Sequence, residues 1–239
     1  MNVYEVSSIQ DRLFGNPYVG RGIMVGKTQD GKSAAIAYFI MGRSVNSRNR
    51  VFAVENGQFS TQPFDVSKLS DPSLVIYNAI RQHENNLVVT NGDQTDTVYD
   101  FLMKGESFEA ALNTREFEPD GPNFTPRISA MATFDGGDFC YKMNILKSAD
   151  AQGSACVRQN FAYPALNGVG HFIHTYVTDG DPIPSFQGEP ERVAILNDID
   201  AFTDSIWNNL DENNRVSLYT RYVDLQTLKY EERLVNRNK

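Results

Sequence analysis

The chain has 239 residues, a hydrophobic share of 41% and a formal net charge of −8, which is the composition of a globular protein able to bury a sizeable core. A pI near 4.9 argues against nucleic acid as a partner, and no apolar run is long enough to indicate a membrane partner. The first fifteen residues lack a secretion signal, and Cys140 and Cys156 are the only cysteines. We therefore expect a cytoplasmic protein with reduced thiols.

The first half of the chain begins with a predicted β-hairpin. Apolar runs at 19–27 and 33–41 flank an Asp-Gly step, which is typical of a tight turn between two strands. A third strand is expected to begin at Val51. The stretch SDPSLVIYNAIRQ (70–82) has two capping candidates, an early proline and apolar residues at helical spacing, so we predict a helix there.

The rest of the chain alternates short strands and helices, without an internal repeat or a break in composition. This pattern predicts an α+β fold in a single domain spanning 1–239. The expected strands are 86–92, 127–134, 138–146, 170–178 and 215–226, the expected helices are 96–105, 107–116 and 198–210, the expected loops are 118–126 and 179–190, and 147–169 is expected to be irregular.

One motif has two interpretations. Residues 26–33, GKTQDGKS, match the P-loop pattern, in which Lys32 would contact phosphates and Ser33 would bind magnesium. A P-loop is followed by a helix, whereas the apolar run after Ser33 favours a strand. We prefer the hairpin, and a P-loop nucleotide hydrolase is the alternative.

The sequence contains little that indicates a metal or a covalent nucleophile. His171 and His174 are spaced three apart, and on a strand their side chains would point to opposite faces. The nucleophile motif GxSxG does not occur. We expect no metal and no cofactor.

Positive charge is concentrated in one acid-free stretch of this acidic chain. Between Asp30 and Glu55 lie four basic and no acidic residues, and three of the basic residues are arginines in GRSVNSRNRVF (42–52). Arginine binds phosphate and carboxylate groups through paired donors. The cluster therefore predicts a local site for a small anion.

Three stretches together resemble the archaeal-type inosine monophosphate (IMP) cyclohydrolase family. They are YVGRGIMVG (18–26) with GRSVNSRNR (42–50), then VIYNAIRQHENNLVVTNGDQTDTV (75–98), and then NFTPRISA (123–130). The resemblance covers about 18–135. Residues 1–17 form an amino-terminal extension relative to the family, and 147–239 are divergent.

The resemblance implies a four-layer αββα sandwich like that of the N-terminal-nucleophile hydrolases, without a terminal nucleophile because residues precede the matching segment. It also implies dehydrative ring closure of 5-formamidoimidazole-4-carboxamide ribonucleotide to IMP, the last step of purine synthesis. The expected partner is then a purine ribonucleotide. A non-catalytic nucleotide-binding domain is a further alternative, and the sequence leaves open whether the chain forms a homo-oligomer.

The resemblance also indicates site residues by position. Tyr77 is the candidate proton donor or oxyanion partner, and Glu118 is the candidate general base or acid. Either Arg48 or Arg50 is the counterpart of one family arginine, and the sequence leaves both open. The positions that match substrate-binding residues are Arg21, Arg43, Ser44, Asn78, Arg81, Asn91, Gly92, Thr95, Asp96 and Arg127.

Overall fold

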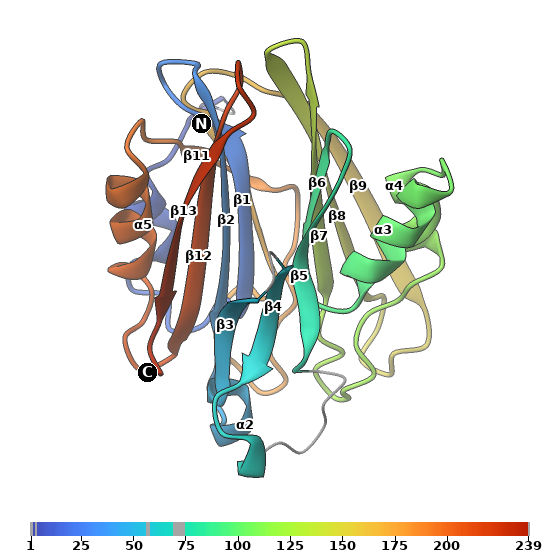
Figure 1. Cartoon of the computed structure of the whole chain (residues 1–239). Coiled ribbons are helices and arrows are strands. Elements are labelled where there is room, and N and C mark those ends of the chain that lie inside the picture. Colours follow the sequence, from blue (N-terminus) through green and yellow to red (C-terminus); the bar gives the residue numbers. More distant parts are fainter. Residues whose placement is uncertain (1, 3, 56–57, 69–74, 239) are drawn as a thin grey trace.

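A computed structural model describes residues 2, 4–55, 58–68 and 75–238 of the chain. The fold is α+β, with two antiparallel sheets and few helices (Figure 1). The six-stranded sheet has the order β11 (Glu191–Ala194), β10 (Val169–His174), β1 (Arg21–Lys27), β2 (Ser33–Met41), β12 (Arg215–Asp224) and β13 (Tyr230–Asn236).

The second sheet has seven strands in nearly sequential order, because hairpins connect most of its neighbours. Its order is β3 (Arg50–Glu55), β4 (Gln58–Pro63), β5 (Tyr77–His83), β6 (Asn86–Thr90), β7 (Arg127–Asp135), β8 (Asp138–Ser148) and β9 (Cys156–Pro164). The α-helices are α1 (Ile9–Leu13), α2 (Val45–Arg48), α3 (Gln94–Met103), α4 (Phe108–Asn113) and α5 (Ile199–Trp207), with a short 3₁₀ turn at Val66–Lys68.

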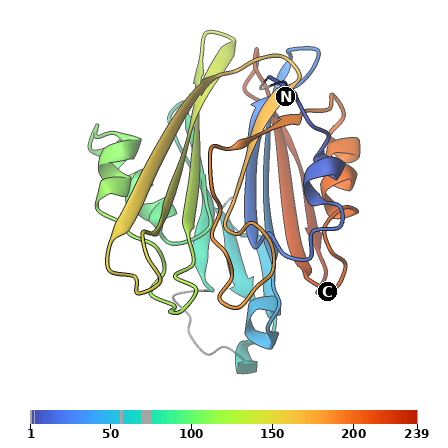
Figure 2. The ribbon, with the colours of Figure 1, turned by 180° about the vertical axis from the view of Figure 1, so that it is seen from behind.

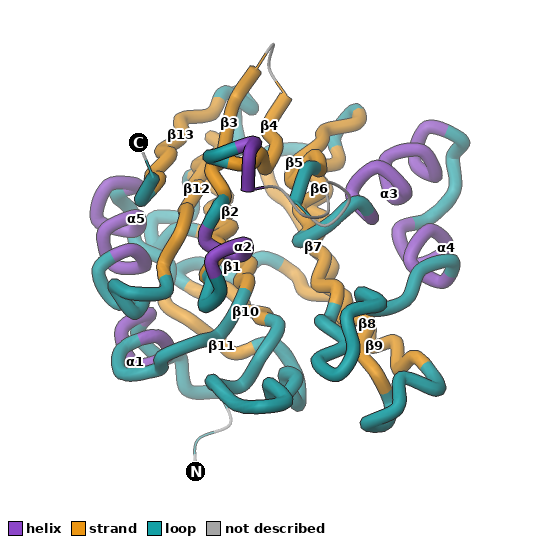
Figure 3. Tube along the Cα trace, turned by 90° about the horizontal axis from the view of Figure 1, so that it is seen from below, coloured by secondary structure: helices purple, strands orange, loops and turns teal. Residues whose placement is uncertain are grey.

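The two sheets face each other across the main hydrophobic core. Aromatic side chains from both sheets meet there; for example, the rings of Phe59 and Tyr219 have centroids 4.3 Å apart. A second core lies between the six-stranded sheet and helices α1 and α5, and a third lies between the seven-stranded sheet and helices α3 and α4. Figures 2 and 3 show these helices on the outer sides of the paired sheets.

The apolar run of β2 follows from its position. Strand β2 pairs with β1 on one side and β12 on the other, and its two faces contribute to different cores. Ile36 and Tyr38 face the second sheet, whereas Ala37 and Phe39 face the helices. A strand buried on both faces shows a continuous apolar run instead of an alternating one.

The predicted first hairpin is confirmed, and the P-loop interpretation is wrong. Strands β1 and β2 pair from Lys27 opposite Ala34 onward, and Gly31 has a φ of +74° in the turn between them. A strand follows where a P-loop requires a helix. The Lys32 side chain is 78% exposed and contacts only Asp30 at 3.8 Å among the described ion pairs, so it does not line a phosphate site.

The predicted helix at 70–82 is wrong where the structure describes it. Residues 77–83 form strand β5, which pairs with β4 and β6, while 70–74 lie outside the described residues. Tyr77 and Ala79 point into the core at the two-residue spacing of a strand. Pairing with a strand on each side therefore makes this segment a strand, although its local sequence signals favour a helix.

The irregular assignment of 147–169 is also wrong, because β9 forms there. This strand is at the edge of its sheet and pairs only with β8. Its residues are exposed or partly buried, so it lacks the apolar alternation that would have indicated a strand. Short elements that the sequence did not predict are α1, α2, β4, β11 and β13.

The other predicted elements are confirmed within a few residues. Helix α5 begins after Asp198, whose side chain accepts a hydrogen bond from the Ala201 amide, and helix α4 begins after Ser107 in the same way. Within the described part of the chain, no helix has the length and apolar character needed to cross a membrane.

Candidate active site

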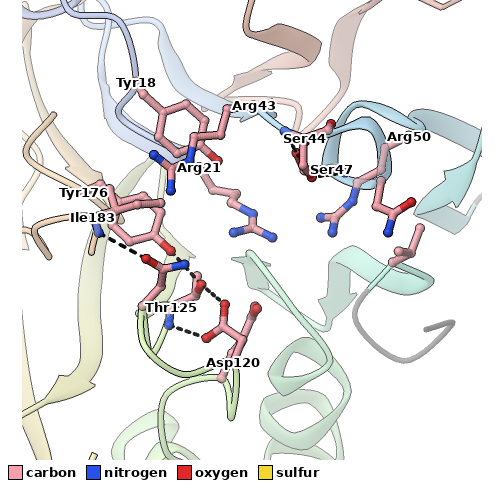
Figure 4. Close-up of a pocket in the computed structure, with 14 residues that line it drawn as sticks. Tyr18, Arg21, Arg43, Ser44, Ser47, Arg50, Asp120, Thr125, Tyr176 and Ile183 are labelled. Carbon is pink, nitrogen blue, oxygen red and sulfur yellow. Dashed lines mark hydrogen bonds between the residues drawn. The ribbon is translucent and has the colours of Figure 1, made fainter. Parts of the chain in front are cut away.

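A cavity of about 310 Å³ opens at the rim of the two sheets, where β1, β3 and β5 begin and β10 ends. Both sheets and the loop before β7 contribute to it (Figure 4). Its lining consists of Tyr18, Arg21, Arg43, Ser44, Asn46, Ser47, Arg50, Val75, Glu118, Asp120, Asn123, Thr125, Tyr176 and Ile183.

Two buried arginines from different sheets dominate the cavity. Arg21 begins β1 and Arg50 begins β3, and the same inward register that buries Ile23 and Phe52 directs both side chains between the sheets. Figure 4 shows the two guanidinium groups pointing into the same space. Among the described residues, Nε of Arg21 and Nε and Nη1 of Arg50 are buried without a hydrogen-bond partner.

The two arginines differ in their electrostatic surroundings. Burial disfavours the charge on Arg21, but Glu118 and nearby tyrosine hydroxyls outweigh it, so the pKa of Arg21 lies above its ordinary value. Burial and the like charge of Arg21 hold the pKa of Arg50 below its ordinary value. Both guanidinium groups stay charged, since arginine does not lose its proton in proteins. An anion between them would therefore relieve their repulsion.

Glu118 provides the buried carboxyl group of the cavity and is only 4% exposed. Its position is fixed by its backbone, because the Glu118 amide donates to the Thr125 carbonyl at 2.9 Å. Burial raises the pKa of the carboxyl group, although Arg21, Arg127 and Arg50 oppose this. A buried carboxyl group with a raised pKa is typical of an acid or base catalyst.

A pair of tyrosines lies beside the two arginines. The hydroxyl groups of Tyr38 on β2 and Tyr77 on β5 are 2.7 Å apart and buried. Burial and the neighbouring Tyr77 raise the pKa of Tyr38 well above its ordinary value, while Arg21 and Arg50 oppose this rise. Neither tyrosine is among the residues that line the cavity, but Tyr77 interacts electrostatically with both arginines, and Tyr38 holds its hydroxyl group.

The opposite wall is formed by aromatic and loop residues. The rings of Tyr18 and Tyr176 stack with centroids 5.8 Å apart. The Tyr176 hydroxyl contacts the Thr125 hydroxyl at 2.6 Å, and the Thr125 amide donates to Asp120 at 2.6 Å. The Asn123 side-chain oxygen accepts from the Ile183 amide at 3.1 Å, which ties the loop before β7 to the loop after β10.

The remaining residues of the basic cluster have different environments. Arg43 lines the cavity but donates to Asp179 at 2.5 Å and to the Gly180 carbonyl at 2.6 Å. Ser44 caps the short helix α2 by accepting from the Ser47 amide. Arg48 does not line the cavity, and it donates to the Gly42 carbonyl at 2.9 Å and to Asn214 at 2.7 Å.

Three of the predicted binding residues lie on the other face of the seven-stranded sheet. Asp96 on α3 accepts from Asn78 at 3.0 Å and from Arg81 at 2.9 Å. The Arg81 guanidinium also lies 3.4 Å from the centre of the Tyr99 ring. None of these residues lines the cavity. Their hydrogen bonds join β5 to α3.

The turn between β6 and α3 is also held by internal hydrogen bonds. Buried Asn91 donates to the Pro126 carbonyl and accepts from the Ile128 amide and Gln94, and Thr95 contacts Thr90 at 2.7 Å. Gly92 leaves room for Arg127, since an added Cβ would lie 2.5 Å from Nη1 of Arg127. These residues do not line the cavity.

Arg127 lies outside the cavity, beside the turn between β6 and α3. It donates to Asp93 at 2.6 Å and to Gln94 at 2.7 Å. Its charge nevertheless lowers the pKa of Glu118 in opposition to burial. Arg127 therefore influences the cavity electrostatically, through its effect on Glu118.

The sequence did not indicate nine of the fourteen residues that line the cavity. Tyr18, Asn123 and Thr125 lie within the stretches that resemble the family, but the resemblance indicated no role for them. Asp120 lies in a predicted loop and Tyr176 in a predicted strand, and no sequence pattern indicated a role for either side chain. Only the fold brings these segments beside β1 and β3.

The described residues contain no group of three or more histidine, cysteine or acidic side chains that could hold a metal ion. The two histidines of the HxxH motif point to opposite faces of β10, as expected. His171 contacts Tyr141 at 2.6 Å between the sheets, and His174 contacts the Tyr176 carbonyl at 2.7 Å. Cys140 and Cys156 are free.

These features describe an α+β protein whose cavity suits a small organic anion: two arginines with buried nitrogen atoms that lack hydrogen-bond partners among the described residues, a buried carboxyl group and an aromatic wall. A family model described as IMP cyclohydrolase-like protein matches residues 18–227. The chain therefore belongs to the IMP cyclohydrolase-like protein family.

Several archaeal proteins named IMP cyclohydrolase are similar to this chain. The protein of Methanopyrus kandleri is 35% identical over 126 residues, which are 51% of this chain and 61% of that protein. The protein of Methanocella arvoryzae is 33% identical over 122 residues (48% and 58%), and that of Methanocaldococcus jannaschii is 31% identical over 116 residues (48% and 56%). The matched region thus spans about six tenths of the length of these relatives.

Proposed function

We propose that the protein is an IMP cyclohydrolase that closes 5-formamidoimidazole-4-carboxamide ribonucleotide to IMP. The observation that carries this proposal is the placement of Arg21, Arg50 and Glu118 in one buried cavity of a chain from this family. The names of the archaeal relatives support the same substrate.

The reaction needs positioning, proton transfer and charge stabilisation. The carboxamide nitrogen attacks the formyl carbon of the same molecule and loses one proton, and the formamido nitrogen loses a second proton. The former formyl oxygen takes up both protons and leaves as water. Because the attack is intramolecular, a site that holds the reactive rotamer supplies much of the acceleration. Negative charge that develops on the formyl oxygen requires donors aimed at it.

We assign these roles to residues of the cavity and to the tyrosine pair beside it. Arg21 and Arg50 have free donors for the phosphate or for the developing oxyanion. Glu118 exchanges the proton between nitrogen and departing oxygen, which its raised pKa favours. Tyr77, held by Tyr38, donates toward the same oxygen. Arg43 binds the nucleotide at the rim, and of the two candidate arginines we choose Arg50 over Arg48.

The architecture proposal extends the observed fold. We interpret the two sheets and their outer helices as the four-layer αββα sandwich of the N-terminal-nucleophile hydrolases, formed by one domain. Support comes from pairing across the whole chain, since β1 pairs with β10 and β2 with β12. The divergent carboxy-terminal segment thus supplies part of the six-stranded sheet.

Purified protein mixed with the formamido ribonucleotide in the presence of a chelator tests the function. Ring closure followed by ultraviolet absorbance is the expected result, and it would also establish that no metal is needed. Binding of IMP without ring closure would indicate the non-catalytic alternative. Absence of both binding and ring closure would contradict the proposal.

A further inference from the structure

A chain of three hydrogen-bonding groups forms one wall of the cavity. The Thr125 hydroxyl donates to one oxygen of Asp120, and the Thr125 amide donates to the other at 2.6 Å. The Tyr176 hydroxyl contacts the Thr125 hydroxyl at 2.6 Å (Figure 4). Tyr176 and Asp120 both line the cavity, so the chain runs along its surface.

The direction of these hydrogen bonds follows from a count of protons. A carboxylate only accepts, and a threonine hydroxyl has a single hydrogen. Since that hydrogen is donated to Asp120, the contact with Tyr176 requires the tyrosine to donate to threonine. The Tyr176 hydrogen is then directed along the cavity wall toward Thr125, and a lone pair of the Tyr176 oxygen can accept a hydrogen bond from a ligand.

The state of Tyr176 agrees with this direction. Burial raises the pKa of its hydroxyl group, although Arg21 and Thr125 oppose this. The hydroxyl group therefore keeps its hydrogen, which Thr125 receives. Stacking on Tyr18 restricts the ring, so the oxygen holds one position.

We propose that Asp120 and Thr125 position Tyr176 as a hydrogen-bond acceptor that takes an N–H or O–H donor of the bound purine ribonucleotide. This inference rests on the proposed function for the identity of the nucleotide. It adds a neutral acceptor to a cavity that also contains arginine donors and the carboxyl groups of Glu118 and Asp120, and this acceptor selects for a donor group of the ligand.

The variant Asp120→Asn is expected to reverse the direction of the hydrogen bond between Tyr176 and Thr125. The Thr125 amide needs an acceptor, so the side-chain oxygen of asparagine takes that position and its NH₂ group faces the Thr125 hydroxyl. The threonine hydrogen is then free to be donated to Tyr176, and we expect Tyr176 to donate into the cavity. The variant changes hydrogen-bond polarity while it preserves shape.

Binding of IMP, measured by calorimetry on three variants, tests the inference. Tyr176→Phe loses one hydrogen bond, for which we expect about 3- to 10-fold weaker binding. In Asp120→Asn the Tyr176 hydroxyl would donate toward a donor group of the ligand, and for this conflict we expect roughly 10- to 100-fold weaker binding. The double variant should return to within about threefold of Tyr176→Phe, because removal of the hydroxyl group removes the conflict.

A purely structural role for Asp120 predicts a different pattern. The double variant would then bind about as weakly as the product of the two single losses, or Asp120→Asn would bind as well as Tyr176→Phe. Either outcome would overturn the inference. Thr125→Ser keeps the hydroxyl group and should bind IMP within about twofold of the unmodified protein, whereas Thr125→Val should weaken binding about 3- to 10-fold.

Neutron diffraction separates this inference from the proposed function. Deuterium on Tyr176 should point toward Thr125 in the unmodified protein and into the cavity in Asp120→Asn. Deuterium directed into the cavity of the unmodified protein would contradict the inference even if the enzyme is active. Failure of the unmodified protein to bind IMP or to close the ring would contradict the proposed function and the ligand assigned to Tyr176.

Discussion

The cavity at the rim of the sheets and the polar cluster between β5 and α3 both contain arginine and acidic residues, and both include positions indicated by the same resemblance. In the cavity, Arg21 and Arg50 have buried nitrogen atoms without partners among the described residues. In the cluster, the Asp96 carboxylate accepts from both Asn78 and Arg81. The two regions therefore contain similar groups, but the cluster residues hydrogen-bond to one another, whereas some arginine nitrogens of the cavity lack a partner among the described residues.

This difference is the reason why we propose the cavity, and not the cluster, as the ligand-binding region. A buried cation without a partner is costly unless something else supplies the compensating charge. The cavity leaves that place open, whereas the cluster satisfies its own charges and holds β5 against α3. A match to a family motif does not by itself distinguish these roles, because both kinds of residue are needed for the same active fold.

The largest effect is expected for Arg21→Ala. Removal of this guanidinium group takes away a preorganised donor and leaves Glu118 without its main counter-charge. Loss of one such donor costs about 10²–10³-fold in rate. We expect a loss of that size in kcat/KM for ring closure, and a loss smaller than about threefold would place the reaction elsewhere.

Asn91→Ala should affect stability rather than catalysis. This residue is fully buried and connects the turn before α3 to the loop before β7. Groups left without hydrogen bonds cost about 1–3 kcal/mol each, so we expect a loss of about 2–3 kcal/mol in the free energy of unfolding, measured with urea. The folded fraction should keep its ring-closure activity within about threefold. A large loss of activity at unchanged stability would show that the turn contacts substrate.

The surroundings of His171 form a third buried region for comparison. Burial there disfavours the charged form of the side chain. Burial and the like charge of Arg192 lower the pKa of His171 to about 4, below the ordinary histidine value of about 6.5. Between these values the unfolded chain binds more protons than the folded one, so stability is complete above about pH 6.5 and falls toward pH 4. We expect a loss of about 2 kcal/mol, and His171→Gln should flatten that part of the pH profile. An unchanged profile would contradict this explanation.

Lys32→Ala should have the smallest effect. Its side chain is exposed in the turn between β1 and β2, and its ion pair with Asp30 is long. Exposed ion pairs contribute about 0–1 kcal/mol. Ring closure and stability should both stay close to those of the unmodified protein, whereas loss of nucleotide turnover in this variant would restore the P-loop interpretation.

The sequence predicted the parts of the fold that depend on local signals. The hairpin with Asp30 and Gly31 at its turn and the capped helix after Asp198 are examples. Strand β5 could not be predicted in this way, because its pairing partners override its helix-like capping residues. Edge strand β9 has no buried face to produce a pattern.

The candidate site was predictable only in part, for a related reason. The acid-free arginine stretch indicated an anion site, and the fold brings Arg43 and Arg50 from it to the cavity. No sequence spacing could place Tyr176 beside Thr125, because 51 residues separate them. Likewise, Arg48 and Arg50 are equivalent as sequence candidates, and only the register of β3 directs one of them inward.

That pair of arginines gives the most direct test of the central claim. Arg50→Ala and Arg48→Ala remove the same group two residues apart, one from the cavity and one from contacts with Gly42 and Asn214. We predict that Arg50→Ala lowers kcat/KM for ring closure by about 10²-fold or more, while Arg48→Ala stays within about threefold of the unmodified protein. Equal activity of the two variants, or a larger loss in Arg48→Ala, would contradict the assignment of the cavity as the active site.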